Sequence, residues 1–336
     1  MRFVTPVLLI IFIGVLVWQS LDIKSYRDWH TIEQEYPVKD EEVFFQDVEV
    51  IQSPQDEKWL LKLIDWAKKE IKVAVYIFTV PSLRDALIRA RTRGVTVQVI
   101  LEKNPYNLGG INKETRGVFQ ENNIAFYESD EKYFSFMHAK YMIFDEKWMI
   151  STANWTRSSF STNREFFIIG KDLSILSDLN AVFATDFGGK KWYFDKSDLI
   201  IGPTNARERL IKFAQSSQKF LHLYTPSFTD AKIKAEFTKI CDSGRDIHIL
   251  IDENEENIQS KKVWRQGLCP EIRMMKSPTL HAKSLIRDNE QAFIGSFNFT
   301  ENSLEKNREL GIFIKKDSIS QIVNSFQKDW EKSIAF

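Results

Sequence analysis

Residues 138–169 read HAKYMIFDEKWMISTANWTRSSFSTNREFFII, and residues 281–314 read HAKSLIRDNEQAFIGSFNFTENSLEKNRELGIFI. Both stretches begin with His-x-Lys, pass through apolar runs and contain Asn-Arg-Glu before a final apolar run. The two leading histidines lie 143 positions apart, and after a one-residue shift the Asn-Arg-Glu runs at 163–165 and 307–309 still correspond. Self-similarity of this length predicts one structural unit that is present twice.

The segments upstream of both stretches share one alternation of elements. In the first half, the short β-branched runs 73–78 and 95–101 are typical of buried strands, and the helical spacing between them ends at Gly94. In the second half, residues 220–224 and 247–251 are the corresponding strands. Strands that alternate with helices predict an α/β fold.

The chain of 336 residues is therefore expected to have four parts. They are an apolar N-terminal segment (1–21), a polar tether (22–45), a first repeat (46–192) and a second repeat (193–336). The two repeats are expected to meet about a pseudo-twofold axis and to act as one body.

The duplicated His-x-Lys pairs carry the expected chemistry. Two residues apart on a strand, His138 and Lys140 point to one side, as do His281 and Lys283. One neutral histidine can attack phosphorus and form a phosphohistidine, while the other, protonated, protonates the leaving alcohol and later activates water or an acceptor alcohol. The lysines neutralise the non-bridging oxygens, so this chemistry requires no metal.

A carboxylate is expected to orient each histidine and to favour its charged form. The candidates are Asp145, Asp288, Glu165 and Glu309. The two aspartates also suit hairpin turns, and the two glutamates have neighbouring arginines as alternative partners. Hydroxyl and amide groups that suit a phosphate oxygen follow each motif: Thr152, Asn154, Ser296 and Asn298.

The pattern HxKxxxxD followed by GSxN, present twice, resembles the phospholipase D superfamily, also called HKD proteins. The second copy fits throughout, with His281, Lys283, Asp288, Gly295, Ser296 and Asn298. The first copy has Ser151-Thr152 in place of Gly-Ser, and its run after Asp145 is one residue shorter. The resemblance covers nearly all of residues 46–336.

This resemblance implies two tandem α-β-α sandwich repeats, one active site shared by both motifs, and no cofactor. Members of the superfamily more often use the N-terminal histidine as nucleophile. On that basis His138 is assigned as nucleophile and His281 as general acid and base.

The N-terminal segment Phe3–Trp18 carries no charge, and extending it to Leu21 gives 19 residues. A helix that crosses a bilayer needs roughly 20 apolar residues. A cleaved signal peptide is the alternative, but Trp18 is a poor residue three positions before a cut. We therefore expect an uncleaved transmembrane anchor, single-pass, with the catalytic body on the exported side of the membrane.

The chain has two cysteines, Cys241 and Cys269. On the exported side of a membrane they can pair in a disulfide. Their spacing does not distinguish such a pair from two free buried thiols, and both alternatives stay open at this stage.

The substrate is expected to be a phosphodiester. Lys+Arg and Asp+Glu both number 46, so the net charge is zero, which excludes attachment to nucleic acid by bulk positive charge. Together with the anchor, this favours a phospholipase D-like enzyme whose partner and substrate is a phospholipid membrane, acting by hydrolysis or by transfer to an alcohol. An apolar approach to the first motif is consistent with it: Tyr133, Phe134, Phe136, Met137 and Trp155.

Two alternatives remain. A metal-independent nuclease acting on single-stranded nucleic acid would use the same aromatic and basic residues for stacking and phosphate binding. A non-catalytic scaffold ranks last, because both motifs retain His, Lys, Asp and Asn. No obligatory protein partner is evident from the sequence.

Overall fold

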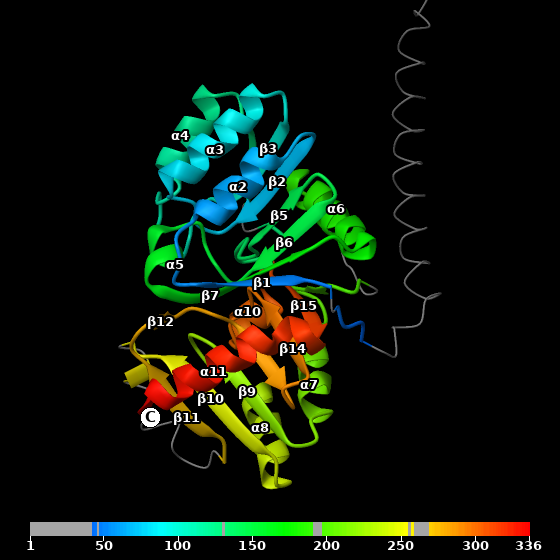
Figure 1. Cartoon of the computed structure of the whole chain (residues 1–336), viewed down its shortest axis with the longest axis vertical. Coiled ribbons are helices and arrows are strands. Elements are labelled where there is room, and N and C mark those ends of the chain that lie inside the picture. Colours follow the sequence, from blue (N-terminus) through cyan, green and yellow to red (C-terminus); the bar gives the residue numbers. More distant parts are fainter. Residues whose placement is uncertain (1–41, 46, 130–131, 191–196, 255–256, 259–268) are drawn as a thin grey trace, which may run out of the picture. The chain divides into compact units, whose positions relative to one another are not determined.

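The computed structural model describes residues 42–45, 47–129, 132–190, 197–254, 257–258 and 269–336. Glu42–Phe336 form one compact unit (Figure 1). The expected anchor (1–21), most of the tether (22–41) and the boundary between the repeats lie outside the described residues. In the described part of the chain, none of the helices combines the length and the apolar character that crossing a membrane requires.

The first repeat contains a mixed sheet. Its strands lie in the order β1 (Glu49–Ser53), β7 (Asn163–Gly170), β6 (Lys147–Ser151), β5 (Tyr141–Phe144), β2 (Glu70–Val75), β3 (Thr96–Glu102) and β4 (Ala125–Ser129). Strands β2, β3 and β4 are parallel, and the other pairs are antiparallel.

The second repeat repeats this order. Its strands are β8 (Ile200–Ile201), β15 (Leu310–Lys315), β14 (Gln291–Gly295), β13 (Ser284–Arg287), β9 (Phe220–Tyr224), β10 (Asp246–Asp252) and β11 (Glu271–Met275), followed by the short β16 (Ile334–Ala335). A further short strand, β12 (Thr279–Leu280), pairs with β7 of the first repeat. The predicted α/β class with two repeats is confirmed.

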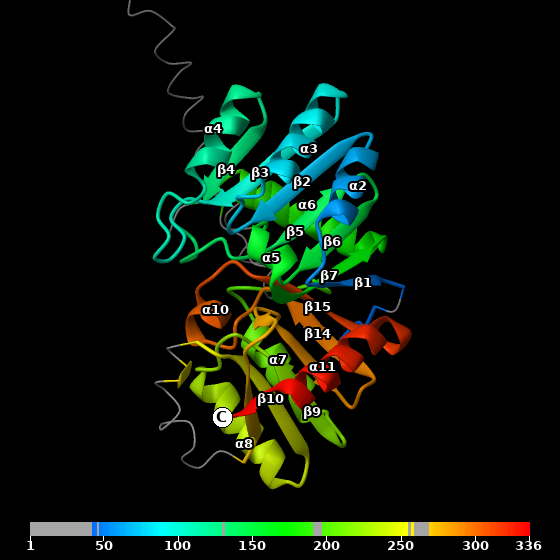
Figure 2. The ribbon, with the colours of Figure 1, turned by 60° about the vertical axis from the view of Figure 1, so that its left-hand side comes forward.

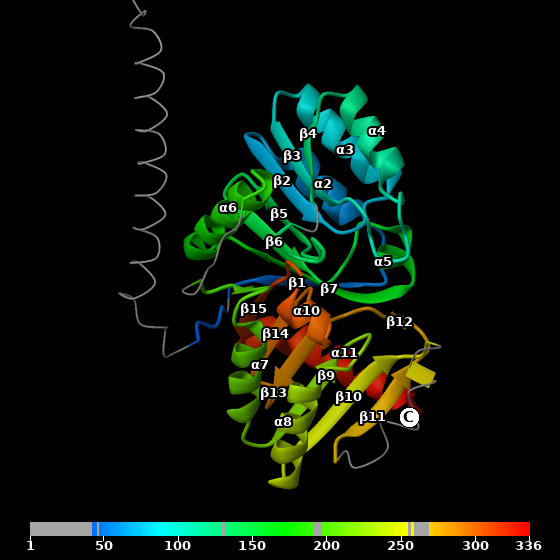
Figure 3. The ribbon, with the colours of Figure 1, turned by 180° about the vertical axis from the view of Figure 1, so that it is seen from behind.

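Helices cover both faces of each sheet (Figures 1 and 3). In the first repeat they are α2 (Lys58–Trp66), α3 (Pro81–Thr92), α4 (Lys113–Glu121), α5 (Arg157–Ser161) and α6 (Leu173–Phe187). In the second they are α7 (Ala206–Gln215), α8 (Ala231–Asp242), α10 (Glu301–Glu305), the 3-10 turn η1 (Lys316–Ile319) and α11 (Ser320–Lys332).

Three apolar cores hold these layers together. One lies under α2, α3 and α4, and a second lies under α7 and α8. The third joins α6 and α11 to the opposite faces of both sheets, so it spans the two repeats. Each repeat is therefore a helix–sheet–helix sandwich, and the shared core makes the two repeats one body.

The start of the described chain corrects the expected tether boundary. Phe45 donates its backbone N–H to Phe313 at 3.0 Å and accepts from Lys315 at 2.9 Å. The ring of Phe44 lies 5.4 Å from that of Phe313, and Glu42 pairs with Arg209. Residues 42–45, assigned to the tether from sequence, therefore belong to the body, because they extend the edge of the second sheet.

The two cysteines form a disulfide between the end of α8 and the residues that precede β11. When the two repeats are aligned by the pairing of their strands, Arg91 and Asn123 of the first repeat stand at the positions of Cys241 and Cys269. There the Arg91 Nε donates to the Asn123 carbonyl at 3.4 Å. Closing a loop with a sequence separation of 28 is expected to stabilise the fold by about 3.6 kcal/mol.

Candidate active site

Each His-x-Lys pair is held by the backbone of the other repeat. The His138 N–H donates to the carbonyl of Arg308 at 2.9 Å, and the His281 N–H donates to that of Arg164 at 3.3 Å. Strand β12, which leads into His281, runs parallel to the start of β7. The chain therefore contacts the opposite repeat just before each histidine, which brings both motifs to the junction between the sheets.

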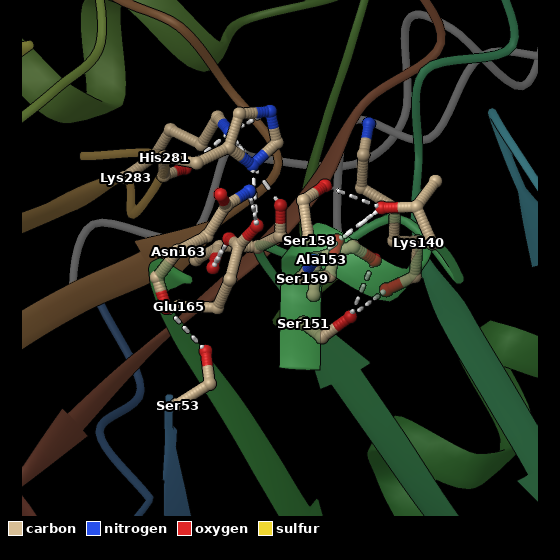
Figure 4. Close-up of polar contacts among 12 residues, drawn as sticks. Ser53, Lys140, Ser151, Ala153, Ser158, Ser159, Asn163, Glu165, His281 and Lys283 are labelled. Carbon is tan, nitrogen blue, oxygen red and sulfur yellow. Dashed lines mark hydrogen bonds and ion pairs between the residues drawn. The ribbon is translucent and has the colours of Figure 1, made fainter. Parts of the chain in front are cut away.

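The carboxylate that contacts each histidine also comes from the other repeat. The Nδ1 of His138 lies 2.8 and 2.9 Å from the two carboxylate oxygens of Glu309. The Nδ1 of His281 lies 2.6 Å from Oε1 of Glu165, as Figure 4 shows. An ionised carboxylate accepts a hydrogen bond, so Nδ1 of each ring carries the proton and Nε2 carries the lone pair. The Nε2 of His281 lies 3.3 Å from the Nζ of Lys283.

Neighbouring side chains fix the carboxylate of Glu165. Thr152 donates to its Oε2 at 2.6 Å, and Asn163 donates to its Oε1 at 3.4 Å. Burial raises the pKa of Glu165, but the charges and hydrogen bonds of His281, Lys283 and Thr152 outweigh it and hold the pKa below its usual range. Glu165 is therefore an ionised carboxylate with a fixed orientation.

Glu309 is held in a corresponding way. Ser303 donates to its Oε1 at 2.5 Å and Asn307 at 3.4 Å, and a hydrogen bond from Ser296 lowers its pKa further. The structure thus gives Ser296 and Thr152 a role in supporting the glutamates. Both residues are fully buried.

The two lysines are almost completely buried beside the histidines. The Nζ of Lys283 lies 3.1 Å from Nδ1 of His281 and 3.5 Å from the carbonyl of Thr152 in the other repeat. The Nζ of Lys140 donates to the carbonyl of His138. Burial lowers the pKa of Lys283 to about 8, opposed by the two glutamates, and it also lowers the pKa of Lys140.

Both histidines are neutral at neutral pH in the free protein. Burial lowers the pKa of His138 to about 4, with the two lysines adding to this effect and Glu309 opposing it. Burial also lowers the pKa of His281, and again both lysines contribute. The two lysines thus act on both imidazoles, so the four groups form one electrostatic cluster.

The amides of Asn154 and Asn298 follow the ends of β6 and β14. The Oδ1 of each is buried, and neither Oδ1 accepts a hydrogen bond within the described part of the chain. Leaving a buried amide without a partner costs free energy, about 1–3 kcal/mol. This cost is offset if a polar ligand binds there, as was expected for these two residues from the sequence.

The prediction that Asp145 and Asp288 orient the histidines is wrong. Both lie in hairpin turns with positive φ, at 53° and 54°. The Asp145 carboxylate accepts from the amides of residues 68–70 at 2.8–3.1 Å, and that of Asp288 accepts from residues 218–220 at 2.8–3.0 Å. They are turn residues that fix the start of β2 and β9. This is the hairpin-turn role that the sequence allowed as an alternative.

The arginines of the two Asn-Arg-Glu runs connect the repeats. Arg164 on β7 pairs with Asp329 on α11 at 2.7 Å, and Arg308 pairs with Asp186 on α6 at 3.0 Å. All four side chains are at least nine-tenths buried. Since the carbonyls of the same two arginines accept from the histidine amides, these crossed ion pairs also position the two motifs.

One residue near the site has no counterpart in the second repeat. The ring of Tyr76 lies edge-on to His138, with centroids 4.7 Å apart, and Lys140 Nζ lies 5.2 Å from its centroid. The strand registers place Pro226 at the matching position. Because Tyr76 is not repeated, the similarity between the two halves could not identify it as a site residue. Asn163 and Asn307 belong to the repeated Asn-Arg-Glu runs, so that similarity did identify them.

Replacing Asp329 by Asn is expected to lower the free energy of unfolding by about 3 kcal/mol, because Arg164 would keep a buried charge without its counter-charge. Denaturant titration measures this loss. Asp65→Asn is the matched control, since Asp65 pairs with Arg89 at 3.0 Å on the surface and its loss should cost less than about 1 kcal/mol. Equal effects of the two substitutions would contradict the assignment.

The pH dependence of turnover is expected to reflect Lys283. As pH rises through about 8, this lysine loses its proton and with it the charge that binds a phosphodiester, so kcat/KM should fall on the alkaline side. Lys283→Arg should move this decline to higher pH, since arginine stays protonated. An unchanged alkaline limb in Lys283→Arg would show that another group is responsible.

A family model described as "Cardiolipin synthase, PLD-like domain" matches residues 60–187 and 210–330, one match in each repeat. A cardiolipin synthase of Clostridium perfringens (strain 13 / Type A) is 26% identical over 160 residues, which cover 41% of this chain and 32% of the relative. The chain thus aligns with about a third of the length of this curated relative.

Two solved structures share the fold. A phosphatidylserine synthase from Haemophilus influenzae Rd KW20 has a TM-score of 0.68 at 13% identity, and the match covers 88% of this chain and 89% of that one. A polyphosphate kinase from Porphyromonas gingivalis has a TM-score of 0.66 at 14% identity, covering 84% of this chain and 50% of that one. With the family model matching most of both repeats, the chain belongs to this PLD-like family of the phospholipase D superfamily.

Proposed function

We propose that the protein is a phosphodiesterase of the phospholipase D type that acts on a phospholipid and passes the phosphatidyl group to an alcohol through a phosphohistidine. The observation that carries this proposal is the crossed pair of neutral histidines. Each ring is fixed at Nδ1 by a buried glutamate of the other repeat, and a buried lysine lies beside each one.

In the first step, Nε2 of His138 attacks phosphorus, and the bond from phosphorus to the leaving alcohol oxygen breaks. His281 gives that oxygen its proton. The phosphate anion, once bound, raises the pKa of His281 and so favours the protonated form that this step needs. The second step reverses these roles, because His281 takes the proton of the acceptor alcohol, whose oxygen displaces His138.

Transfer is favoured over hydrolysis by the relatives. The curated relative is named a cardiolipin synthase, and a structural neighbour is named a phosphatidylserine synthase. Both names describe enzymes that build phospholipids. We therefore propose an alcohol as the physiological acceptor, with water as a slower competitor, in place of a dedicated hydrolase.

We further propose that residues 1–21 anchor the protein in a membrane and that the body is exported. The uncharged N-terminal run supports the anchor. The disulfide between Cys241 and Cys269 supports export, because disulfides persist in oxidising compartments.

The full chain in lipid vesicles tests the proposal. It should be given phosphatidylcholine with ethanol, phosphatidylcholine with glycerol and, separately, single-stranded DNA, all with a chelator present. Formation of phosphatidylethanol or of a new glycerol ester supports transfer, whereas release of phosphatidic acid alone supports hydrolysis. Cleavage of DNA with no reaction of any phospholipid would overturn the proposal in favour of a nuclease.

A further inference from the structure

We infer that the loop joining β3 to α4, residues 103–112, is a membrane-contacting element that enters an anionic phospholipid surface with Tyr106 and Leu108. This inference rests on the proposed function, since it names the surface from which the same site takes its substrate. The loop can be followed between β3 and α4 in Figure 2.

The first observation is exposure. Tyr106 is 70% exposed and Leu108 is 46% exposed, and the two lie on one short loop. Exposed apolar residues that occur singly are ordinary, but here two are exposed two positions apart, and tyrosine is enriched at membrane–water interfaces. The exposed Ile258 lies in the corresponding connection of the second repeat.

The second observation is that the loop is fixed at the active site. The Tyr106 N–H donates to the Tyr76 hydroxyl at 2.6 Å, and Tyr76 contacts His138. Phe136 lies between, with ring centroids 6.0 Å from Tyr76 and 6.4 Å from Tyr106. The Asn112 side chain donates to the carbonyls of Tyr76 and Glu102 at 2.9 Å. The apolar tip is thus presented by a hydrogen-bonded frame, and rings connect it to the candidate nucleophile.

The third observation is charge. Exposed Lys103 begins the loop and exposed Lys113 follows it, and residues 103–113 contain no acidic side chain. The next carboxylate, Glu114, is paired with Arg84 at 2.7 Å, and Glu102 is buried. Lysines beside apolar residues fit the negative surface of an anionic membrane, which selects a lipid surface over an apolar patch of another protein.

The test is carried out on the full chain reconstituted in vesicles of phosphatidylcholine and phosphatidylglycerol. The chain's two cysteines are paired, so Leu108→Cys introduces a unique free thiol for a polarity-sensitive fluorophore. Lipids that carry a quencher in the bilayer should quench the probe at position 108. The matched control is Leu173→Cys, which is 73% exposed at the start of α6, beyond the far end of β7 from Glu165. This probe should stay unquenched.

A second measurement uses activity. Leu108→Ser should reduce the ratio of turnover on vesicles to turnover on a short-chain, water-soluble phospholipid by about tenfold, because an apolar side chain no longer enters the interface. Leu173→Ser should keep the wild-type ratio. Equal quenching at positions 108 and 173, or an unchanged ratio in Leu108→Ser, would overturn the inference. If position 108 is quenched but neither form of phospholipid reacts, the loop assignment stands and the proposed function fails.

Discussion

Replacing His138 by asparagine is expected to reduce turnover of a phosphodiester by about 10⁴-fold or more, because the attacking nitrogen is lost while the shape of the side chain is nearly kept. Its Nδ1 is fixed by Glu309 at 2.8 and 2.9 Å and its pKa lies at about 4, so the free ring is a neutral, oriented nucleophile. Steady-state assays with phosphatidylcholine and ethanol measure the loss.

An activated substrate separates the two histidines. With bis(p-nitrophenyl) phosphate the leaving group needs no proton, so His281→Asn should still release one equivalent of p-nitrophenol in a burst and accumulate phosphorylated protein. His138→Asn should show neither the burst nor the label. Mass spectrometry locates the label, and a phosphate found on His281 in the His138 variant would reverse the two roles.

Replacing Glu309 by glutamine is expected to reduce kcat/KM by about 10²–10⁴-fold, since a neutral amide neither fixes the ring as strongly nor stabilises its positive charge. Glu309 lies 171 residues from His138 in sequence and is fully buried beside it. The burst with bis(p-nitrophenyl) phosphate should slow in Glu309→Gln, because this carboxylate acts on the attacking ring.

Glu165→Gln provides the internal comparison, since it acts on the other ring. Its burst should remain fast, whereas its turnover of a phospholipid with an unactivated leaving group should fall. Glu271→Gln, 53% exposed and paired with Arg273, controls for the loss of one negative charge. If Glu165→Gln and Glu309→Gln slow the burst equally, the division of labour between the histidines is refuted.

Much of the fold could be predicted from the duplicated sequence. The runs at 220–224 and 247–251 are found within β9 and β10, and Gly94 and Gly244 adopt the positive φ that ends α3 and α8. Local patterns sufficed because strand and helix periodicity are local properties. The two His-x-Lys pairs were found for the same reason.

Which carboxylate contacts which histidine could not be predicted from local sequence patterns. Glu165 and His281 are 116 residues apart, and their contact depends on how the chain crosses between the repeats before each motif. The misassignment of Asp145 was avoidable. It lies five residues beyond Lys140, and an extended strand rises about 3.3 Å per residue, so its carboxylate is roughly 16 Å further along the sheet.

The crossed contacts limit how the two halves can be recombined. A chimera that joins residues 42–190 of this chain to the second half of a relative would be incomplete unless the incoming half supplied partners for His138, Arg164 and Asp186. Carrying both halves on one polypeptide fixes their ratio at one to one and keeps matched partners together through synthesis. Each half therefore depends on specific residues of the other, as one subunit of a heterodimer depends on its partner, although the two halves are covalently joined.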